Sequence, residues 1–200
     1  MHPPDRRQVC VAALALAVAA PAAAAFGFDE LMAVLAQRQS GEAKFAEQRF
    51  VSVLDQPLNY TGTLSFKAPD RLVRTTLTPR QESFVVEGNQ ITLQRGERVR
   101  HLALDSMPEL AALVAALRGT LSGDGSTLRH YFKPTVDGAA ARWTLKLVPL
   151  DFRLLGVVRS VRIDGFQADV RMVELELADG DRSVTMIEPI APSRARSATP

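Results

Sequence analysis

One ten-residue stretch indicates the fold most clearly: LNYTGTLSFK, residues 58–67. Every second residue of it is apolar or glycine, and the residues between them are polar or charged. Successive side chains of a β-strand point to opposite faces of a sheet, so this alternation predicts a strand with one apolar and one solvated side. The apolar side consists of Leu58, Tyr60, Gly62, Leu64 and Phe66.

Nine further segments are predicted strands, which makes about ten in all. They span residues 72–78, 82–87, 90–95, 99–104, 128–133, 142–148, 161–164, 170–177 and 183–187. Short turns such as Gly88-Asn89 and Asp179-Gly180-Asp181 lie between neighbours. Parallel strands need long crossovers, so this spacing predicts antiparallel hairpins. Residues 151–158 are ambiguous and are compatible with a short helical turn.

Two segments have the periodicity of helices. The first carries Phe28, Leu31, Met32 and Leu35 at spacings of i, i+3, i+4 and i+7, and we expect it to end near residues 40–41. The second follows the start signal Ser106-Met107-Pro108-Glu109, in which Ser caps the helix and Glu lies three residues later.

The second helix is predicted to close at Arg118-Gly119, and no polar side chain lies between Glu109 and Arg118. A helix that is apolar all round must be covered on several sides. A sheet of about ten antiparallel strands is expected to curl. Together these features predict a curved sheet with a helical lid over an apolar hollow. The alternative is that the helices fill the hollow and leave an inert core.

The first 25 residues have the pattern of a secretory signal peptide. Arg6 and Arg7 precede an apolar run over residues 9–20, and small residues follow at 21–25. Cleavage after Ala25 would leave a single domain over residues 26–190, a tail over 191–200, and no cysteine. The remaining chain would hold 22 basic and 21 acidic side chains without a basic block, so nucleic-acid binding is not expected. Export without disulfides suits a bacterial periplasm.

The sequence offers no catalytic or metal-binding pattern. His101 and His130 are isolated on separate predicted segments, whereas zinc sites use paired ligands. No nucleophile elbow, phosphate-binding loop or dinucleotide fingerprint is present. We therefore expect neither an enzyme nor a cofactor or metal.

Several short motifs, taken in order, resemble the LolA family of periplasmic carriers of outer-membrane lipoproteins. They are Phe45-Ala46-Glu47-Gln48, the segment 62–69, Glu87-Gly88-Asn89 and Ile91-Thr92-Leu93. The resemblance implies an incomplete antiparallel barrel whose cavity receives acyl chains under a movable helical lid. It also implies transfer of acylated cargo from an inner-membrane donor to an outer-membrane acceptor.

One position departs from the family pattern. The family strand ends in Lys-Arg-Pro, and its arginine is tied to lid closure, but here the strand ends in Lys67-Ala68-Pro69. Arg71 or Arg74 is the possible replacement for a lid contact. The departure indicates a diverged, LolA-like member.

The resemblance and the alternation together nominate binding residues. The expected cavity residues are Tyr60, Leu64, Phe66, Phe84, Trp143 and Leu145, and the expected lid residues are Leu31, Leu35, Leu110, Leu113, Val114 and Leu117. Plain core packing is the competing interpretation for each. We expect a monomeric carrier of a lipoprotein or lipid. The alternative function is a periplasmic lipid-sensing or regulatory module of the same fold.

Overall fold

The computed structural model of the protein describes residues 26–191, which form eleven strands and five helical segments. The helical segments are α1 (Phe28–Leu35), η1 (Leu104–Ser106), α2 (Pro108–Ser122), α3 (Gly125–Tyr131) and α4 (Phe152–Leu155). The segment predicted as a signal peptide, residues 1–25, lies outside the described residues, as do residues 192–200 of the predicted tail.

The strands follow one another in two runs, separated by η1, α2 and α3. The first run is β1 (Ser40–Phe50), β2 (Leu58–Lys67), β3 (Arg71–Thr78), β4 (Glu82–Glu87), β5 (Gln90–Arg95) and β6 (Arg98–Ala103). The second run is β7 (Phe132–Ala139), β8 (Arg142–Pro149), β9 (Val158–Phe166), β10 (Asp169–Leu177) and β11 (Arg182–Ile190).

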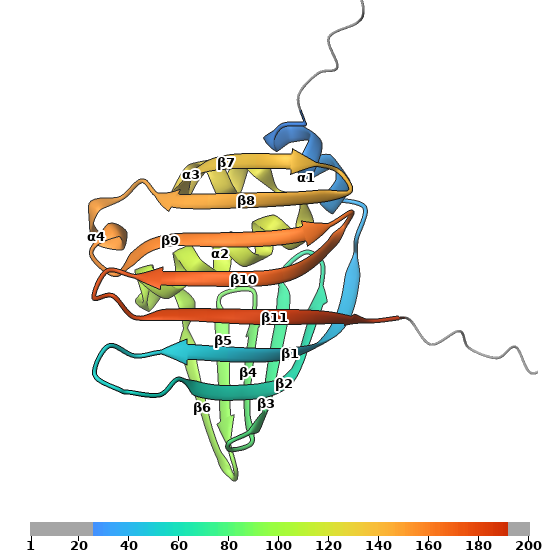
Figure 1. Cartoon of the computed structure of the whole chain (residues 1–200). Coiled ribbons are helices and arrows are strands. Elements are labelled where there is room, and N and C mark those ends of the chain that lie inside the picture. The colour runs from blue at the N-terminus through green and yellow to red at the C-terminus, as the bar shows by residue number, and fades with distance from the viewer. Residues whose placement is uncertain (1–25, 192–200) are drawn as a thin grey trace, which may run out of the picture.

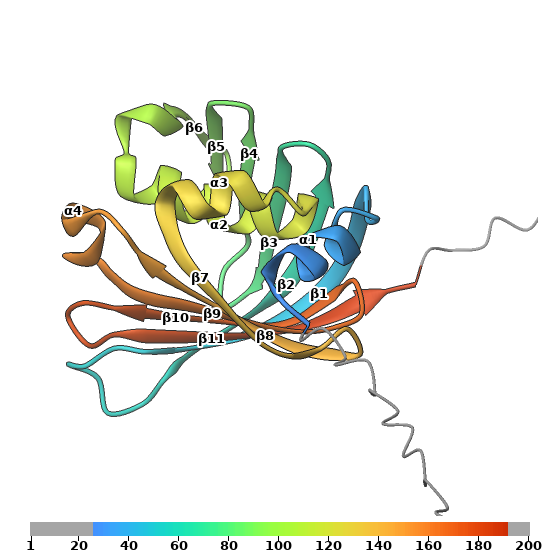
Figure 2. The ribbon, with the colours of Figure 1, turned by 90° about the horizontal axis from the view of Figure 1, so that it is seen from above.

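All eleven strands belong to one antiparallel sheet in the order β6-β5-β4-β3-β2-β1-β11-β10-β9-β8-β7 (Figure 1). The two runs meet in the middle, where β1 pairs with β11. The sheet is strongly curved, and its edge strands β6 and β7 do not pair with each other (Figure 2). The predicted curved, incomplete antiparallel barrel is therefore confirmed.

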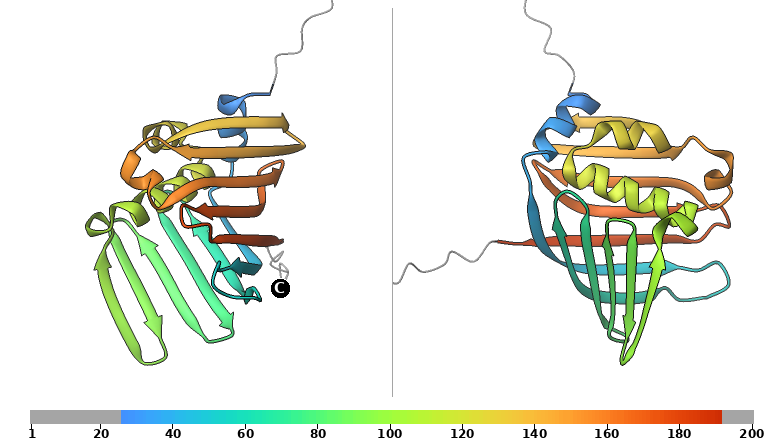
Figure 3. Two further views of the ribbon diagram at one scale, coloured as in Figure 1. Left: turned by 60° about the vertical axis from the view of Figure 1, so that its left-hand side comes forward. Right: turned by 180° about the vertical axis from the view of Figure 1, so that it is seen from behind.

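The helices cover the concave face of this sheet. The chain leaves one edge at β6, passes through η1, α2 and α3, and re-enters the sheet at the opposite edge, β7 (Figure 3). This connection places α2 across the hollow side of the sheet. The path of the chain, together with the apolar composition of α2, therefore produces the predicted helical cover.

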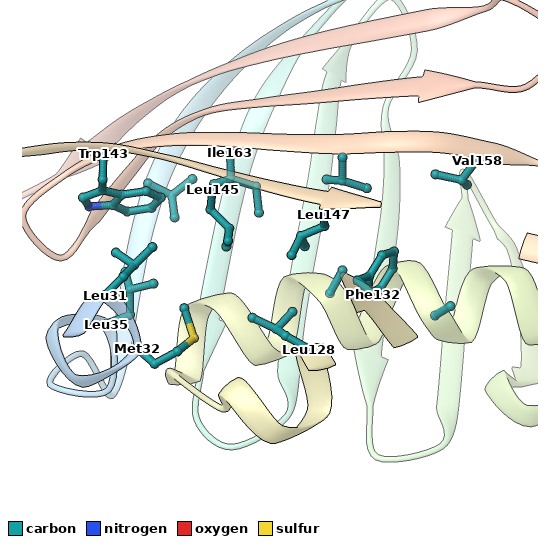
Figure 4. Packing of buried hydrophobic residues seen from close by; sticks show 14 of the residues in the cluster. Leu31, Met32, Leu35, Leu128, Phe132, Trp143, Leu145, Leu147, Val158 and Ile163 are labelled. Atoms are coloured by element: carbon teal, nitrogen blue, oxygen red, sulfur yellow. The ribbon is translucent and has the colours of Figure 1, made fainter. Parts of the chain in front are cut away.

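Two separate apolar clusters pack against α2. The larger one contains Trp143, Leu145 and Leu147 of β8 together with Leu31, Met32 and Leu35 of α1 (Figure 4). The smaller one contains Val86, Ile91, Leu104 and Val114. Ala112 and Ala116 of α2 belong to the first cluster and Val114 to the second, so the helix joins the two.

The first run contains one strand that the alternation did not predict. Strand β1 pairs with β2 on one side and β11 on the other, and α1 ends at Leu35 instead of near residue 40. On the inward face of β1 lie Ala43, Phe45 and Glu47, all buried. A carboxylate at the third inward position breaks the apolar period, which is why the strand is difficult to find from the sequence.

The prediction of a strand over 128–133 is wrong. This segment is mostly α3, and β7 begins only at Phe132. Asp124 caps the helix: its carboxylate accepts hydrogen bonds from the Thr127 backbone N–H (3.1 Å) and from the Ser126 hydroxyl (2.6 Å). Leu128, fully buried in the larger cluster, attaches the helix to the core.

Helix α2 also differs from its prediction at both ends. It continues past Gly119 to Ser122, and Gly123 ends it with a left-handed φ of 70°. Ser106 does not cap the helix, because it lies in η1 and donates its hydroxyl to the Ala103 carbonyl oxygen. The ambiguous residues 151–158 contain α4, a short helical turn.

Gly62 allows β1, β2 and β3 to pack closely, which leads to a first prediction. A Cβ atom on Gly62 would lie 1.9 Å from the Thr75 carbonyl oxygen and 2.8 Å from the Phe45 ring. We expect Gly62→Ala to lower the free energy of unfolding by about 1–3 kcal/mol in urea denaturation, because the strands must separate. The control is Gly41→Ala, whose Cβ would meet only the Arg38 side chain at 3.6 Å or more. Equal losses in the two variants would contradict this explanation.

The Asp124 cap leads to a pH-dependent prediction. Hydrogen bonds from Ser126 and Thr127 lower the pKa of Asp124 to about 2. The ordinary pKa of Asp is about 3.9, so the stabilisation is complete above that value and disappears as the pH falls from about 4 to about 2. We expect Asp124→Ala to lower the free energy of unfolding by about 1 kcal/mol at neutral pH and by much less near pH 2. Asp137→Ala, on the exposed edge of β7, is the control. A penalty that does not change with pH would contradict the capping role.

Candidate functional site

A cavity of about 240 Å³ lies between α2 and the middle of the sheet. Its walls come from β1 to β4, from β9 to β11 and from α2, so both runs of strands contribute. Its lining includes the side chains of Ala43, Leu64, Phe66, Arg74, Phe84, Val114, Leu117, Leu121 and Ile187. The helices therefore do not fill the hollow, and the alternative of a solid inert core is not what the structure shows.

The cavity is a consequence of the two-cluster packing. Trp143 and Leu145 fill the space under α1, and Val86 and Ile91 fill the space under the start of α2. The middle of the sheet between these clusters is covered by α2 alone. Val114 of the smaller cluster and Ile163 of the larger one both line the cavity, and the space between them is lined mainly by aliphatic and aromatic groups.

Six of the nominated residues line this cavity. They are Leu64, Phe66 and Phe84 of the expected cavity set, Val114 and Leu117 of the expected lid set, and Arg74. Leu64, Arg74 and Phe84 stand opposite one another on β2, β3 and β4. Because directly opposite residues share a face of the sheet, these three side chains form one part of the wall.

The other apolar residues nominated for the site lie elsewhere in the fold. Trp143, Leu145, Leu31 and Leu35 belong to the larger core cluster and are at most 1% exposed, because α1 packs directly against β8 (Figure 4). Leu113 packs against the same cluster and Leu110 against the smaller one.

Tyr60 and Arg71 also lie outside the cavity lining. The Arg49 guanidinium lies 5.0 Å from the centre of the Tyr60 ring. Arg71 forms an exposed ion pair with Glu87, at 2.6 Å. Neither Arg71 nor Arg74 has a hydrogen bond to α2 within residues 26–191, but Arg74 lines the same cavity as Val114 and Leu117 of that helix.

A different arginine, Arg118, connects the lid helix to the sheet. Its Nη1 donates a hydrogen bond to the Gly88 carbonyl oxygen in the turn between β4 and β5, at 3.0 Å. Its Nε and Nη2 atoms are buried without a hydrogen-bond partner in the part of the chain that the structure describes. Burial lowers the pKa of the Arg118 guanidinium, and the nearby Asp70 carboxylate partly opposes this shift. The sequence signal, an arginine at the end of an apolar run, by itself predicts only the end of the helix.

The cavity is a candidate site for an apolar ligand. Over residues 26–191, no group of three or more His, Cys, Asp or Glu side chains is arranged to hold a metal ion. None of the helices in that range is long and apolar enough to cross a membrane.

A partly open antiparallel barrel with an apolar cavity under helices can bind an apolar ligand. The family described as outer membrane lipoprotein carrier protein LolA-like matches residues 19–200. The chain therefore belongs to the LolA-like family, which confirms the resemblance drawn from the short motifs. Members of this family are periplasmic or extracellular. A search of the curated proteins finds no match.

Solved structures with a similar arrangement are distant in sequence. A LolA superfamily protein from Nitrosomonas europaea is 10% identical with a TM-score of 0.43, over 81% of this chain and 91% of that one. A DUF1329 family protein from Desulfovibrio piger is 8% identical with a TM-score of 0.44, over 80% and 90%. The MucA/MucB complex from Pseudomonas aeruginosa gives 15% identity and a TM-score of 0.44, over 84% of this chain and 59% of that one.

The two unpartnered nitrogen atoms of Arg118 lead to a prediction about the lid helix. A buried donor without a partner is unfavourable by about 1–3 kcal/mol, and opening of α2 would return these donors to water. We therefore expect Arg118→Met to stabilise the closed position and to slow amide hydrogen exchange in α2 by about tenfold.

The control for this experiment is Arg129→Met. Arg129 lies on α3 and forms an exposed ion pair with Asp29, so its removal should change exchange in α2 little. Faster exchange in the Arg118 variant would instead show that the bond to Gly88 holds the helix in place.

Proposed function

We propose that this protein is a periplasmic carrier that shelters the acyl chains of a lipoprotein or lipid and passes them toward the outer membrane. The observation that supports the proposal is the cavity under α2, lined by apolar side chains from both runs of strands. In this proposal residues 1–25 are a signal peptide that directs export.

The energetics of acyl chains explain why such a cavity is useful. Exposing one CH₂ group to water is unfavourable by about 0.8 kcal/mol, so a lipid anchor does not leave a membrane and cross an aqueous compartment unaided. A dry cavity removes most of this penalty without any covalent chemistry. Leu64, Phe66 and Leu117 supply the apolar surface for it.

The size of the cavity requires the lid to move. Pockets that hold drug-sized ligands are typically about 300–1,000 Å³, and this one is about 240 Å³ in the closed structure. A cargo with more than one acyl chain must therefore displace α2. Val114 and Leu117 of α2 line the cavity, so opening would replace their contacts with the sheet by contacts with the cargo.

A carrier must also release its cargo. The buried, incompletely bonded guanidinium of Arg118 keeps the closed lid from being too stable, which favours exchange. We infer that an inner-membrane donor loads the protein and that an outer-membrane acceptor unloads it, with the carrier acting as a monomer in between.

Filling the cavity tests this function. Leu117→Trp adds a large ring to the roof of the cavity, and we expect it to weaken the binding of a neutral fluorescent apolar probe, N-phenyl-1-naphthylamine, by at least about tenfold. The matched control is Leu77→Trp on β3, at a side chain that is 53% exposed and outside the cavity lining.

Binding is measured by fluorescence titration, and folding of each variant is verified by circular dichroism. If the wild-type protein does not bind the probe, or if the two tryptophan variants bind it equally well, the carrier proposal fails. Native mass spectrometry of the protein isolated from the periplasm should also detect bound lipid or lipoprotein.

A further inference from the structure

The wall of the cavity contains a charged group among its apolar side chains. Arg74 lines the cavity, and its guanidinium donates a hydrogen bond to the Glu47 carboxylate on β1. The guanidinium also lies 4.2 Å from the centre of the Phe45 ring, in a cation–π arrangement. Glu47 is 3% exposed, so the pair is placed in the interior of the sheet's concave side.

Stability does not explain a charged pair at this place. Transferring charges from water into an apolar environment is unfavourable, and replacing a buried ion pair by apolar residues of similar size is often neutral or stabilising. The neighbours of Arg74 on β2 and β4 are Leu64 and Phe84, which shows that apolar side chains fit this part of the wall. The pair is therefore a candidate for recognition.

Arg74 has donors available for a ligand. A guanidinium carries five N–H donors, and Glu47 is the one hydrogen-bond partner of Arg74 within residues 26–191. The side chain remains 29% exposed and lines the cavity. Its orientation is set by Glu47 and by the Phe45 ring, so the remaining donors are held in place before a ligand binds.

We propose that Arg74 is the recognition point for the oxygen of an acyl group, and that the cavity therefore selects acylated amphiphiles over plain hydrocarbons. This inference rests on the proposed function, because it concerns the polar end of a chain already sheltered by the cavity. The acyl chain lies against Leu64, Phe84 and Leu117, and its carbonyl or carboxyl oxygen accepts a hydrogen bond from Arg74.

Glu47 acts as a positioning residue in this arrangement. Its second oxygen accepts a hydrogen bond from Arg49 at 3.0 Å, so the three side chains Arg49, Glu47 and Arg74 carry a net charge of +1. This charge is compatible with a neutral ester or amide oxygen and with a carboxylate. Esters, amides and carboxylates all have a hydrogen-bond acceptor oxygen on the first carbon of the acyl chain.

Three ligands of equal chain length separate recognition from simple burial: dodecane, methyl laurate and lauric acid. Each competes with N-phenyl-1-naphthylamine for the cavity. We expect methyl laurate, lauric acid or both to bind the wild-type protein at least about tenfold more tightly than dodecane, because a hydrogen bond to a charged donor is among the stronger ones. The comparison of ester with acid shows which acyl form is preferred.

The decisive variant is Arg74→Met combined with Glu47→Gln, which removes both charges and leaves neither partner buried alone. We expect dodecane to bind this variant as it binds the wild type, and the preference for the acyl compounds to disappear. Arg71→Met is the matched control, since Arg71 is on the same strand but forms its ion pair outside the cavity. Circular dichroism and urea unfolding verify that all variants are folded.

The outcomes are distinct. Equal binding of all three ligands to the wild type, or a preference that persists in the folded double variant, overturns the inference while the cavity function stands. Failure of all three ligands to displace the probe overturns both the inference and the carrier proposal. A preference lost in the Arg71 variant as well would also overturn the inference, because the effect would then not depend on the cavity.

Discussion

The packing of α2 across the concave face of the sheet is the constraint on which the rest of the structure depends. The strands β6 and β7 are the two edges of one sheet, and the chain joins them through η1, α2 and α3. A helix in that connection must cross the hollow. Since every side chain of α2 between Glu109 and Arg118 is apolar, the helix contributes to both core clusters and covers the space between them.

The cavity and its lid follow from this division of the core. Burial of Trp143 and Leu145 on one side and of Ile91 on the other stabilises the fold without occupying the middle of the sheet. The middle can therefore stay open for a ligand. In our proposal the same helix that completes the core moves to admit cargo, and the two donors of Arg118 that have no partner within residues 26–191 make this movement less unfavourable.

Arginines have separate roles in this member of the LolA-like family. Position 68, where the family pattern has an arginine, holds alanine. The contact between lid and sheet comes from the helix side, through Arg118 and the Gly88 carbonyl oxygen. The arginine inside the cavity, Arg74, is bonded to the sheet residue Glu47. In our proposals Arg118 adjusts how readily the lid helix opens, and Arg74 recognises the acyl group of the ligand that enters the cavity.

The sequence by itself determined the fold class and part of the site. The alternation over residues 58–67 correctly assigned Leu64 and Phe66 to the inward face, because a strand permits only two side-chain directions. The all-apolar run of α2 likewise required a helix covered on several sides. These properties are local, since they follow from the order of neighbouring residues.

Only the tertiary structure decided which apolar residues face the cavity and which are core. Trp143 and Leu145 have the same strand alternation as Leu64 and Phe66, but α1 packs over the first pair and only α2 over the second. Residues 128–131 belong to helix α3 because Asp124 caps it and Leu128 has a place in the core. Glu47 and Arg74, 27 residues apart in the chain, form their pair because β1 and β3 flank β2. Such contacts join segments that are distant in the sequence, so the local periodicity of the sequence cannot predict them.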